Sequence, residues 1–216
     1  MKIYYLEMRS PDELRPKPCS DPEFAVLETA LPQWKLNRFL YQWVGNDYQW
    51  TDRLVWTDEQ WHAYVGDENL RTFIGSKQGS IVGYFELHKE PNENVEIAYF
   101  GLTPDFIGQG YGGALLTEAI QRAWQWGNHR VWVYTCTRDH LAALPNYQAW
   151  GLRIFKVEEK CGGRSRIRAA MGSGFPNGKA HGIAEVVFAC SLDPVNSQLP
   201  WMLTRAPPMT MPGDKP

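Results

Sequence analysis

The stretch from Val95 to Trp126 (VEIAYFGLTPDFIGQGYGGALLTEAIQRAWQW) constrains the fold of this chain more than any other segment. It begins with an apolar, β-rich run over 95–102, which predicts a strand with one carboxylate, Glu96, near its start. A glycine cluster over 108–113 follows, and the apolar residues after it recur at helical spacing. A glycine turn leading into a helix N-terminus is an anion site, because the first N–H groups lack intrahelical partners and the helix dipole strengthens their positive field. The stretch therefore predicts a site for a phosphorylated ligand.

Length and composition bound the class of protein. The 216 residues have room for one full domain, and a hydrophobic content of 44% is enough for a core. A net charge of −2 gives no electrostatic case for binding nucleic acid or a membrane surface. No run approaches the roughly 18 apolar residues of a membrane span, and the first residues lack the apolar core of a signal peptide. The four cysteines lack CxxC spacing, so we expect no metal site and no disulfide framework, and a cytoplasmic location.

The rest of the chain predicts strands and helices on either side of this stretch. Three or four antiparallel strands are expected before the glycine cluster, and the strand that follows its helix must run parallel to 95–102 if the helix is a crossover. The predicted strands cover 2–8, 71–76, 80–88, 95–102, 130–137 and 152–157. Helices are predicted over 23–44 (interrupted at Pro32), from a Thr57 capping box, over the stretch after the glycines, and around Pro145.

Beyond Lys160 the composition changes. Residues 161–182 are rich in Gly, Arg and Ser, and residues 194–216 are rich in Pro. Between them, 184–192 (AEVVFACSL) has the pattern of one last strand. We therefore expect a domain over 1–160, a Gly/Arg-rich loop with that last strand over 161–193, and a Pro-rich, disordered tail over 194–216.

The glycine cluster has two interpretations. Gly108, Gly110 and Gly113 fit G-x-G-x-x-G, the dinucleotide fingerprint, but this match alone is weak. The first glycine does not follow the strand tightly, and the strand over 130–137 ends without a carboxylate placed for a ribose diol. The unit also follows an antiparallel meander instead of opening a doubly wound sheet. A nicotinamide or flavin site is therefore the lesser interpretation.

The second interpretation rests on several motifs in order. Residues 80–157 resemble the GNAT superfamily of acyl-CoA-dependent N-acyltransferases, whose signature is Q/R-x-x-G-x-G/A at a strand–helix turn. Here Gly110-Tyr111-Gly112 supplies the G-x-G, and Tyr147-Gln148-Ala149-Trp150-Gly151-Leu152 resembles the family's Y-x-x-x-G-F. One departure stands out, because Ile107 occupies the position where Gln or Arg is usual.

The resemblance implies an α+β fold in α/β/α layers. Its central sheet is mixed and mostly antiparallel, with one splayed pair of parallel strands and flanking helices. It also implies acetyl-CoA as cosubstrate and an amine acceptor, small or polypeptide, as partner, with a homodimer left open. The residues expected to contact CoA are Leu102, Thr103, Gly108, Gln109, Gly110, Tyr111, Gly112, Gly113 and Asn146.

The resemblance also implies catalytic roles. Glu96 has the spacing of the strand glutamate that acts as general base in the superfamily's histone acetyltransferases; the alternative is a solvated strand glutamate. Tyr147 falls where the family's tyrosine acid points at the CoA sulfur; the alternative is a core tyrosine. The family's oxyanion donor, a backbone N–H where the parallel strands splay, maps onto Leu102. Whether His140 or Asn146 contacts the CoA arm is open.

The acceptor is not readable from the sequence. Five of the ten tryptophans lie between Trp34 and Trp61, interleaved with carboxylates, which would suit a cationic amine; equally, they form a core. We therefore predict a cytoplasmic N-acetyltransferase that transfers an acetyl group directly from acetyl-CoA to a primary amine. The alternative is a GNAT-fold module that binds acyl-CoA or a partner without turnover.

Overall fold

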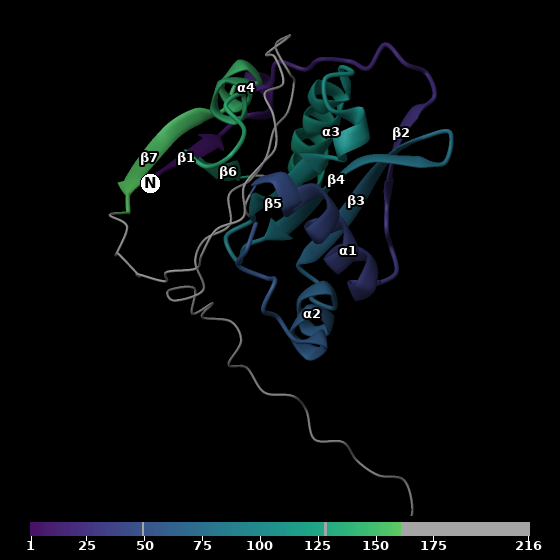
Figure 1. The fold of residues 1–216 in the computed structure, drawn as a ribbon. Helices are drawn as coiled ribbons and strands as arrows, with labels where there is room; N and C mark the ends of the chain where they lie inside the picture. Colours follow the sequence, from purple (N-terminus) through teal and green to yellow (C-terminus); the bar gives the residue numbers. More distant parts are fainter. Residues whose placement is uncertain (49, 128, 161–216) are drawn as a thin grey trace, which may run out of the picture.

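The structure, a computed structural model, describes residues 1–160 apart from 49 and 128 (Figure 1). A seven-stranded sheet forms its centre, in the order β2-β3-β4-β5-β6-β1-β7. Every neighbouring pair is antiparallel except β5 and β6, which are parallel. The predicted α+β fold with one parallel pair is therefore confirmed. The strands are β1 (Lys2–Met8), β2 (Phe24–Glu28), β3 (Leu70–Lys77), β4 (Ser80–Lys89), β5 (Asn94–Leu102), β6 (Arg130–Cys136) and β7 (Arg153–Glu159).

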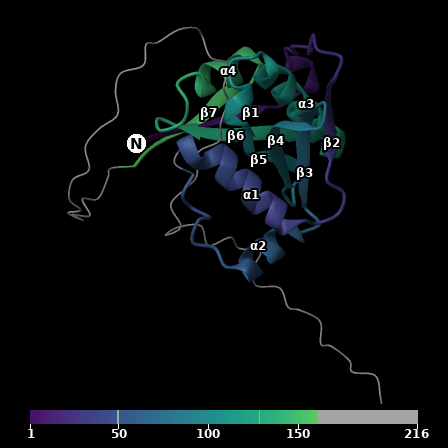
Figure 2. The same cartoon turned by 45° about the vertical axis from the view of Figure 1, so that its right-hand side comes forward.

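Helices cover both faces of the sheet. Figure 2 shows α3 (Tyr111–Trp126) and α4 (Ala143–Ala149) on one face, and α1 (Trp34–Gly45) and α2 (Asp58–Val65) on the other. The predicted capping box begins α2: the Thr57 hydroxyl accepts from the Gln60 N–H, and the Gln60 side chain accepts from the Thr57 N–H. The molecule thus has the three layers that the family resemblance implied.

Each face has its own hydrophobic core. Between α3 and the sheet the core is mostly aliphatic, and Leu115, Leu116 and Ile120 are fully buried there. Burying each such side chain contributes about 1.5–3 kcal/mol. Between α1, α2 and the sheet the core is largely aromatic, with Trp50 and Trp61 almost completely buried. Trp50 and Trp61 therefore form part of a core, which is one of the two interpretations given for the tryptophan-rich segment.

One element differs from the expectation, and the position of another was not predicted. Residues 24–28 form β2, not the start of a helix, because the open edge of β3 pairs with them along their whole length. Tertiary pairing here overrides the helix preference of Ala, Leu and Glu. In addition, β1 lies between β6 and β7, so the N-terminus completes the sheet. The last strand predicted over 184–192 and the tail over 194–216 lie outside the described residues.

The parallel pair separates soon after it forms. The ladder between β5 and β6 joins only Asn94, Val95 and Glu96 to residues 130–132. Both strands continue beyond this point, β5 to Leu102 and β6 to Cys136. Backbone groups at the facing edges of the two strands consequently lack a ladder partner there, which leaves an opening in the sheet that a ligand can fill. We call this opening the splay.

Candidate active site

Glu96 lies where the splay begins. It is the last β5 residue in the parallel ladder, opposite Trp132 of β6, and His88 of β4 is its antiparallel neighbour. The side chain is on the α1/α2 face, because Leu70, which belongs to the core on that face, stands in the same cross-strand row. Burial, and after it the charge of Glu90, raise the pKa of the Glu96 carboxyl to about 7, although the charge of Arg53 opposes the shift. A carboxyl with this pKa can exchange protons at neutral pH.

Tyr147 lies on the opposite face. It is fully buried in the core under α3 and α4, and its hydroxyl has no hydrogen-bond partner among the described residues. Burial first, and the charge of Asp139 second, raise its pKa well above the usual value for tyrosine. Buried hydroxyls are seldom left unpaired, so this one is available to a ligand group. Glu96 and Tyr147 thus lie on opposite faces of the sheet.

The backbone N–H group of Leu102 points toward the splay. Thr103 N–H donates to the Val82 carbonyl of β4 at 2.9 Å. Because N–H groups alternate between the two edges of an antiparallel strand, the preceding N–H, that of Leu102, points to the β6 edge. Thr103 itself is held by β4, since its hydroxyl also donates to the Ile81 carbonyl. Of these two predicted residues, Leu102 is therefore the one that offers an N–H group to a ligand in the splay.

The glycine cluster forms an open turn at the start of α3. Gly108 and Gly110 have φ of 78° and 89°, a left-handed conformation that glycine adopts without strain. Gly110 is the N-cap, and no side chain caps the helix or places a negative charge in its first turn. The first N–H groups of α3, those of Tyr111 to Gly113, are therefore without a capping side chain in a field that favours an anion. This part of the predicted CoA site fits a pyrophosphate.

Side chains around the turn stabilise it instead of pointing at a ligand. Ile107, at the unusual motif position, packs against both hydrophobic cores. The Gln109 amide donates to the Asp105 carbonyl at 2.6 Å. The Tyr111 hydroxyl donates to Asp21, which is also paired with Lys77, and these contacts lower the pKa of Asp21 to about 2. Anion binding at this turn would consequently rest on the backbone.

The segment between β6 and α4 contains a buried carboxyl group, that of Asp139, for which the sequence predicted no role. Asp139 is buried; its Oδ2 accepts from the Thr135 hydroxyl and the Cys136 N–H, whereas its Oδ1 has no partner among the described residues. Burial raises its pKa to about 7. His140 Nδ1 accepts from Ala142 N–H, and Asn146 is half-buried on α4. The choice between His140 and Asn146 as the contact to the CoA arm stays a prediction.

A polar network that the sequence did not indicate crosses the α1/α2 face. Buried Glu86 of β4 accepts from Asn37 of α1 and from the Tyr64 hydroxyl of α2, at 2.9 and 2.6 Å. Asp52 accepts from the hydroxyls of Tyr41 and Tyr99 at 2.6 and 2.8 Å. The sequence signal for this network was Glu86, a charged residue within the largely apolar strand predicted over 80–88.

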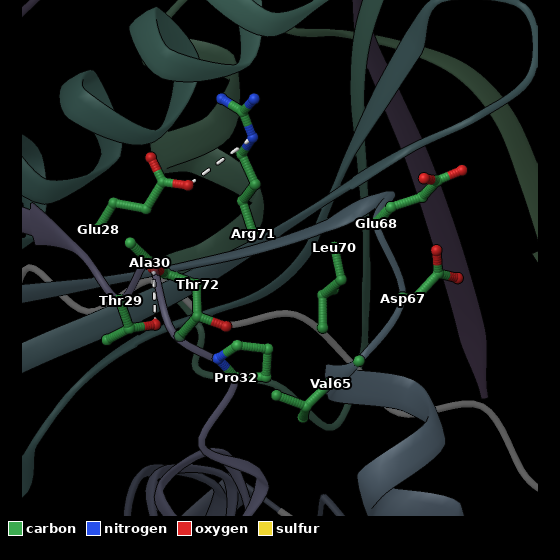
Figure 3. Close-up of a pocket in the computed structure, with 11 residues that line it drawn as sticks. Glu28, Thr29, Ala30, Pro32, Val65, Asp67, Glu68, Leu70, Arg71 and Thr72 are labelled. Atoms are coloured by element: carbon green, nitrogen blue, oxygen red, sulfur yellow. Dashed lines mark hydrogen bonds and ion pairs between the residues drawn. The ribbon is translucent and has the colours of Figure 1, made fainter. Parts of the chain in front are cut away.

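A separate hollow of about 190 Å³ lies between the ends of β2 and β3 and the end of α2 (Figure 3). The ion pair of Glu28 and Arg71, 3.8 Å apart, stands in its wall. Thr72 lines it and accepts a hydrogen bond from Asn37, so it adjoins the polar network. No predicted site residue lines this hollow.

Two further features concern metal ions and membranes. Within residues 1–160, without 49 and 128, no group of three or more His, Cys, Asp or Glu side chains is arranged to hold a metal ion. None of the helices in this part of the chain is both long and apolar enough to cross a membrane.

Comparison with known proteins identifies the family. The profile of the Acetyltransferase (GNAT) family matches residues 36–152, more than half of the chain. Uncharacterized N-acetyltransferases of Mycobacterium bovis and Mycobacterium tuberculosis are 28% identical to this chain over 98 residues, which cover 44% of the chain and 63% of their own length. The chain thus spans less than two thirds of these relatives. It belongs to the GNAT acetyltransferase family, whose members generally bind acetyl-CoA and an amine acceptor.

Solved structures agree on the fold. A GCN5-related N-acetyltransferase from Sphaerobacter thermophilus superposes with a TM-score of 0.56 at 17% identity, over 72% of this chain and 49% of that one. One from Kribbella flavida gives 0.54 at 16% identity, over 73% and 56%. At such identities the likeness concerns the fold alone.

Proposed function

We propose that the chain is an N-acetyltransferase that moves an acetyl group from acetyl-CoA directly to a primary amine. The observation that carries the proposal is the arrangement at the splay. The Glu96 carboxyl, with a pKa of about 7, lies on one face, and the buried Tyr147 hydroxyl, which has no hydrogen-bond partner in the described part of the chain, lies on the other. Bound acetyl-CoA would supply the thioester; the residues of this chain supply proton transfer and positioning.

Glu96 has the properties of the general base. An alkylammonium with a pKa of about 10.4 has no lone pair, so it must lose a proton before it attacks. A carboxyl of pKa about 7 is half ionised at neutral pH and accepts a proton better than an exposed glutamate does. The α1/α2 face is therefore the side from which the amine approaches.

Leu102 and Tyr147 have the properties of the oxyanion donor and of the general acid. The Leu102 N–H faces the splay and would donate to the acetyl oxygen as negative charge develops there. One such donor is worth about 2.7–4 kcal/mol in related chemistry. The Tyr147 hydroxyl would donate its proton to the departing sulfur. A phenol whose pKa is raised by burial stays protonated until that step.

The backbone N–H groups at residues 110–113 would hold the pyrophosphate of CoA. This assignment is supported by the uncapped N-terminus of α3 and by the exposed, left-handed Gly108 and Gly110. Gln109 would contribute by keeping the turn in shape through its bond to Asp105, and Ile107 through packing on both cores. The proposed acceptor amine is either small or part of a polypeptide.

The test measures thiol release from acetyl-CoA with a panel of primary amines. We expect wild-type release well above background with at least one amine. Glu96→Gln should lower kcat/KM by about 10²–10⁴-fold, the usual contribution of a general base. Glu118→Gln, at an exposed ion pair on α3, is the matched control and should behave as wild type.

Two outcomes would contradict the proposal. Background rates with every amine would leave a module that binds acyl-CoA without turnover. Full activity of Glu96→Gln would place the base elsewhere. A thermal-shift screen separates the dinucleotide alternative, because CoA at about 100 times its Kd should add about 2.7 kcal/mol of stability while NAD(P) should add none.

A further inference from the structure

The guanidinium of Arg53 lies inside an aromatic cage on the α1/α2 face. Its central carbon is 3.7 Å from the ring centre of Tyr64, 4.3 Å from that of Tyr99 and 4.5 Å from that of Trp56. These three rings come from α2, from β5 and from the loop between α1 and α2. We call Trp56, Tyr64 and Tyr99 the Arg53 cage. Three ring faces around one cation form the kind of site that recognises ammonium and guanidinium groups.

The cage holds its arginine without close hydrogen bonds to a carboxylate. The distances from Arg53 to Asp52 and to Glu86 are both 3.8 Å, beyond hydrogen-bond range. Its Nη1 is buried and has no hydrogen-bond partner among the described residues. A guanidinium that is present only to neutralise buried carboxylates would be expected to form short, forked bonds to them. Arg53 is instead held by three aromatic rings and two ion pairs at 3.8 Å, a combination that can also bind a cation from outside the chain.

The two carboxylates are held in place by other residues. Tyr41 and Tyr99 donate to Asp52, as described above, and Asn37 and Tyr64 donate to Glu86. Neutral donors would keep both groups oriented toward the cage if Arg53 left it. The rings and carboxylates therefore form a preformed site whose cation can be exchanged.

Arg53 lies at the edge of the core, in a loop, where its side chain is close to solvent. Its side chain is 13% exposed and enters the cage from the loop that precedes α2. The next two residues, Leu54 and Val55, are 49% and 75% exposed. Rotation of the Arg53 side chain toward solvent is therefore the movement that an exchange would require.

The cage adjoins the proposed base. Tyr99 pairs with Glu86, and Glu96 pairs with His88, so the two β5 residues occupy successive positions on the same face. The β-bulge between these pairs accommodates the extra residue. Two residues of the β4 strand span roughly 7 Å, which sets the separation between Tyr99 and Glu96 along the sheet.

We propose that the Arg53 cage is the cation-recognition site of the acceptor pocket and that Arg53 is its exchangeable internal occupant. The acceptor then carries a second cationic group, ammonium or guanidinium, separated by several methylenes from the amine that reacts at Glu96. Until such an acceptor arrives, Arg53 fills the site. The assignment of an acceptor rests on the proposed function; the exchange of cations in the cage does not.

The first experiment measures cation binding without acetyl-CoA. Tryptophan fluorescence and thermal unfolding of Arg53→Ala are followed during titration with methylguanidinium chloride, with potassium chloride at equal ionic strength as reference. We expect saturable binding and a rising Tm, with at least tenfold tighter affinity than in wild type, where the tethered side chain competes. Arg38→Ala is the matched control, because it removes an arginine of an exposed ion pair with α2. If Arg53→Ala binds methylguanidinium no better than Arg38→Ala, the cage is a fixed structural ion site and the proposal is wrong.

A measurement on the wild type covers the case in which Arg53→Ala does not fold. Ring currents from the three aromatic rings should shift the Arg53 Nε–Hε resonance away from its solvent position. Addition of methylguanidinium should move this resonance back toward that position in a saturable manner. A resonance that stays unmoved at high concentrations would overturn the exchange.

The second experiment compares two acceptors that differ in one group. With acetyl-CoA, 1,6-diaminohexane should have a kcat/KM at least tenfold above that of 1-aminohexane, and methylguanidinium should compete with the diamine. Equal kcat/KM values would overturn the acceptor assignment. A chain that binds methylguanidinium in the cage but releases no thiol with any amine would overturn the proposed function and leave the exchange of cations standing.

Discussion

The hydrophobic cores on the two faces of the sheet differ in composition. Under α3 the core is mostly aliphatic, and the Tyr147 hydroxyl is buried there without a hydrogen-bond partner among the described residues. Under α1 and α2 the core is aromatic and encloses Arg53, Asp52 and Glu86. Buried charge is costly unless it is paired, so it persists where it has a role or a partner. In the function that we propose, the α3 face would hold CoA by its backbone, whereas the α1/α2 face would select the acceptor by its side chains.

Removing a charge from the α1/α2 core should have the largest effect on stability. Glu86→Ala leaves Arg53, Asn37 and Tyr64 without the carboxylate between them, so we expect a loss of about 3–5 kcal/mol. Urea unfolding measures this loss. The control is Glu93→Ala, at a surface ion pair, where we expect less than about 1 kcal/mol. A loss for Glu86→Ala as small as that control would mean that the buried network contributes nothing.

The corresponding test on the α3 face shortens a buried aliphatic side chain. Leu116→Ala removes a fully buried side chain and should cost about 2–5 kcal/mol through lost burial and a cavity. Because no ionisable group is involved, the loss should be the same at pH 5 and pH 8. A pH-dependent loss would show that the two faces do not differ as described.

The smallest expected effect is the pH dependence of stability that Glu96 causes. Its pKa is raised from 4.5 to about 7, so between these values the folded chain binds a proton that the unfolded chain has released. Stability should therefore fall as pH rises through this window. Relative to Glu96→Gln, wild type should lose about 1–2 kcal/mol between pH 5 and pH 8, after allowance for partial exposure. The pKa of Asp139 is also raised to about 7, but Asp139 is present in both wild type and Glu96→Gln. Its contribution therefore cancels in the stability difference between them. Parallel stability curves for the two chains would show that Glu96 titrates normally.

The same two faces differ in how far the sequence predicted them. The strand, glycine turn and helix over 95–126 follow local rules of alternation, glycine conformation and helical spacing, and the structure places β5 and α3 there. The parallel partner over 130–137 followed from the crossover, and the hairpin of β3 and β4 from its turn residues. The family resemblance added the fold and proposed roles for Glu96 and Tyr147.

Long-range pairing was not predictable. Residues 24–28 carry helix-forming side chains, and only the free edge of β3 makes them a strand. The position of β1 between β6 and β7 has no local signal either. The Arg53 cage joins residues from a loop, a helix and a strand, so spacing in the sequence could indicate aromatic residues and carboxylates there but not their arrangement. That this segment suits a cationic acceptor stays a prediction; in the structure the cation among these rings is that of Arg53.

The most direct test of the account is a crystal structure of the chain with CoA bound. We expect the pyrophosphate on the N–H groups of residues 110–113 and the pantetheine arm in the splay between β5 and β6. The sulfur should lie about 3–3.5 Å from the Tyr147 hydroxyl, near the distance at which reacting atoms meet, with Glu96 across the opening. CoA bound anywhere other than the splay, or a Tyr147 hydroxyl turned away from the sulfur, would contradict the central claim that the two faces meet there in one active site.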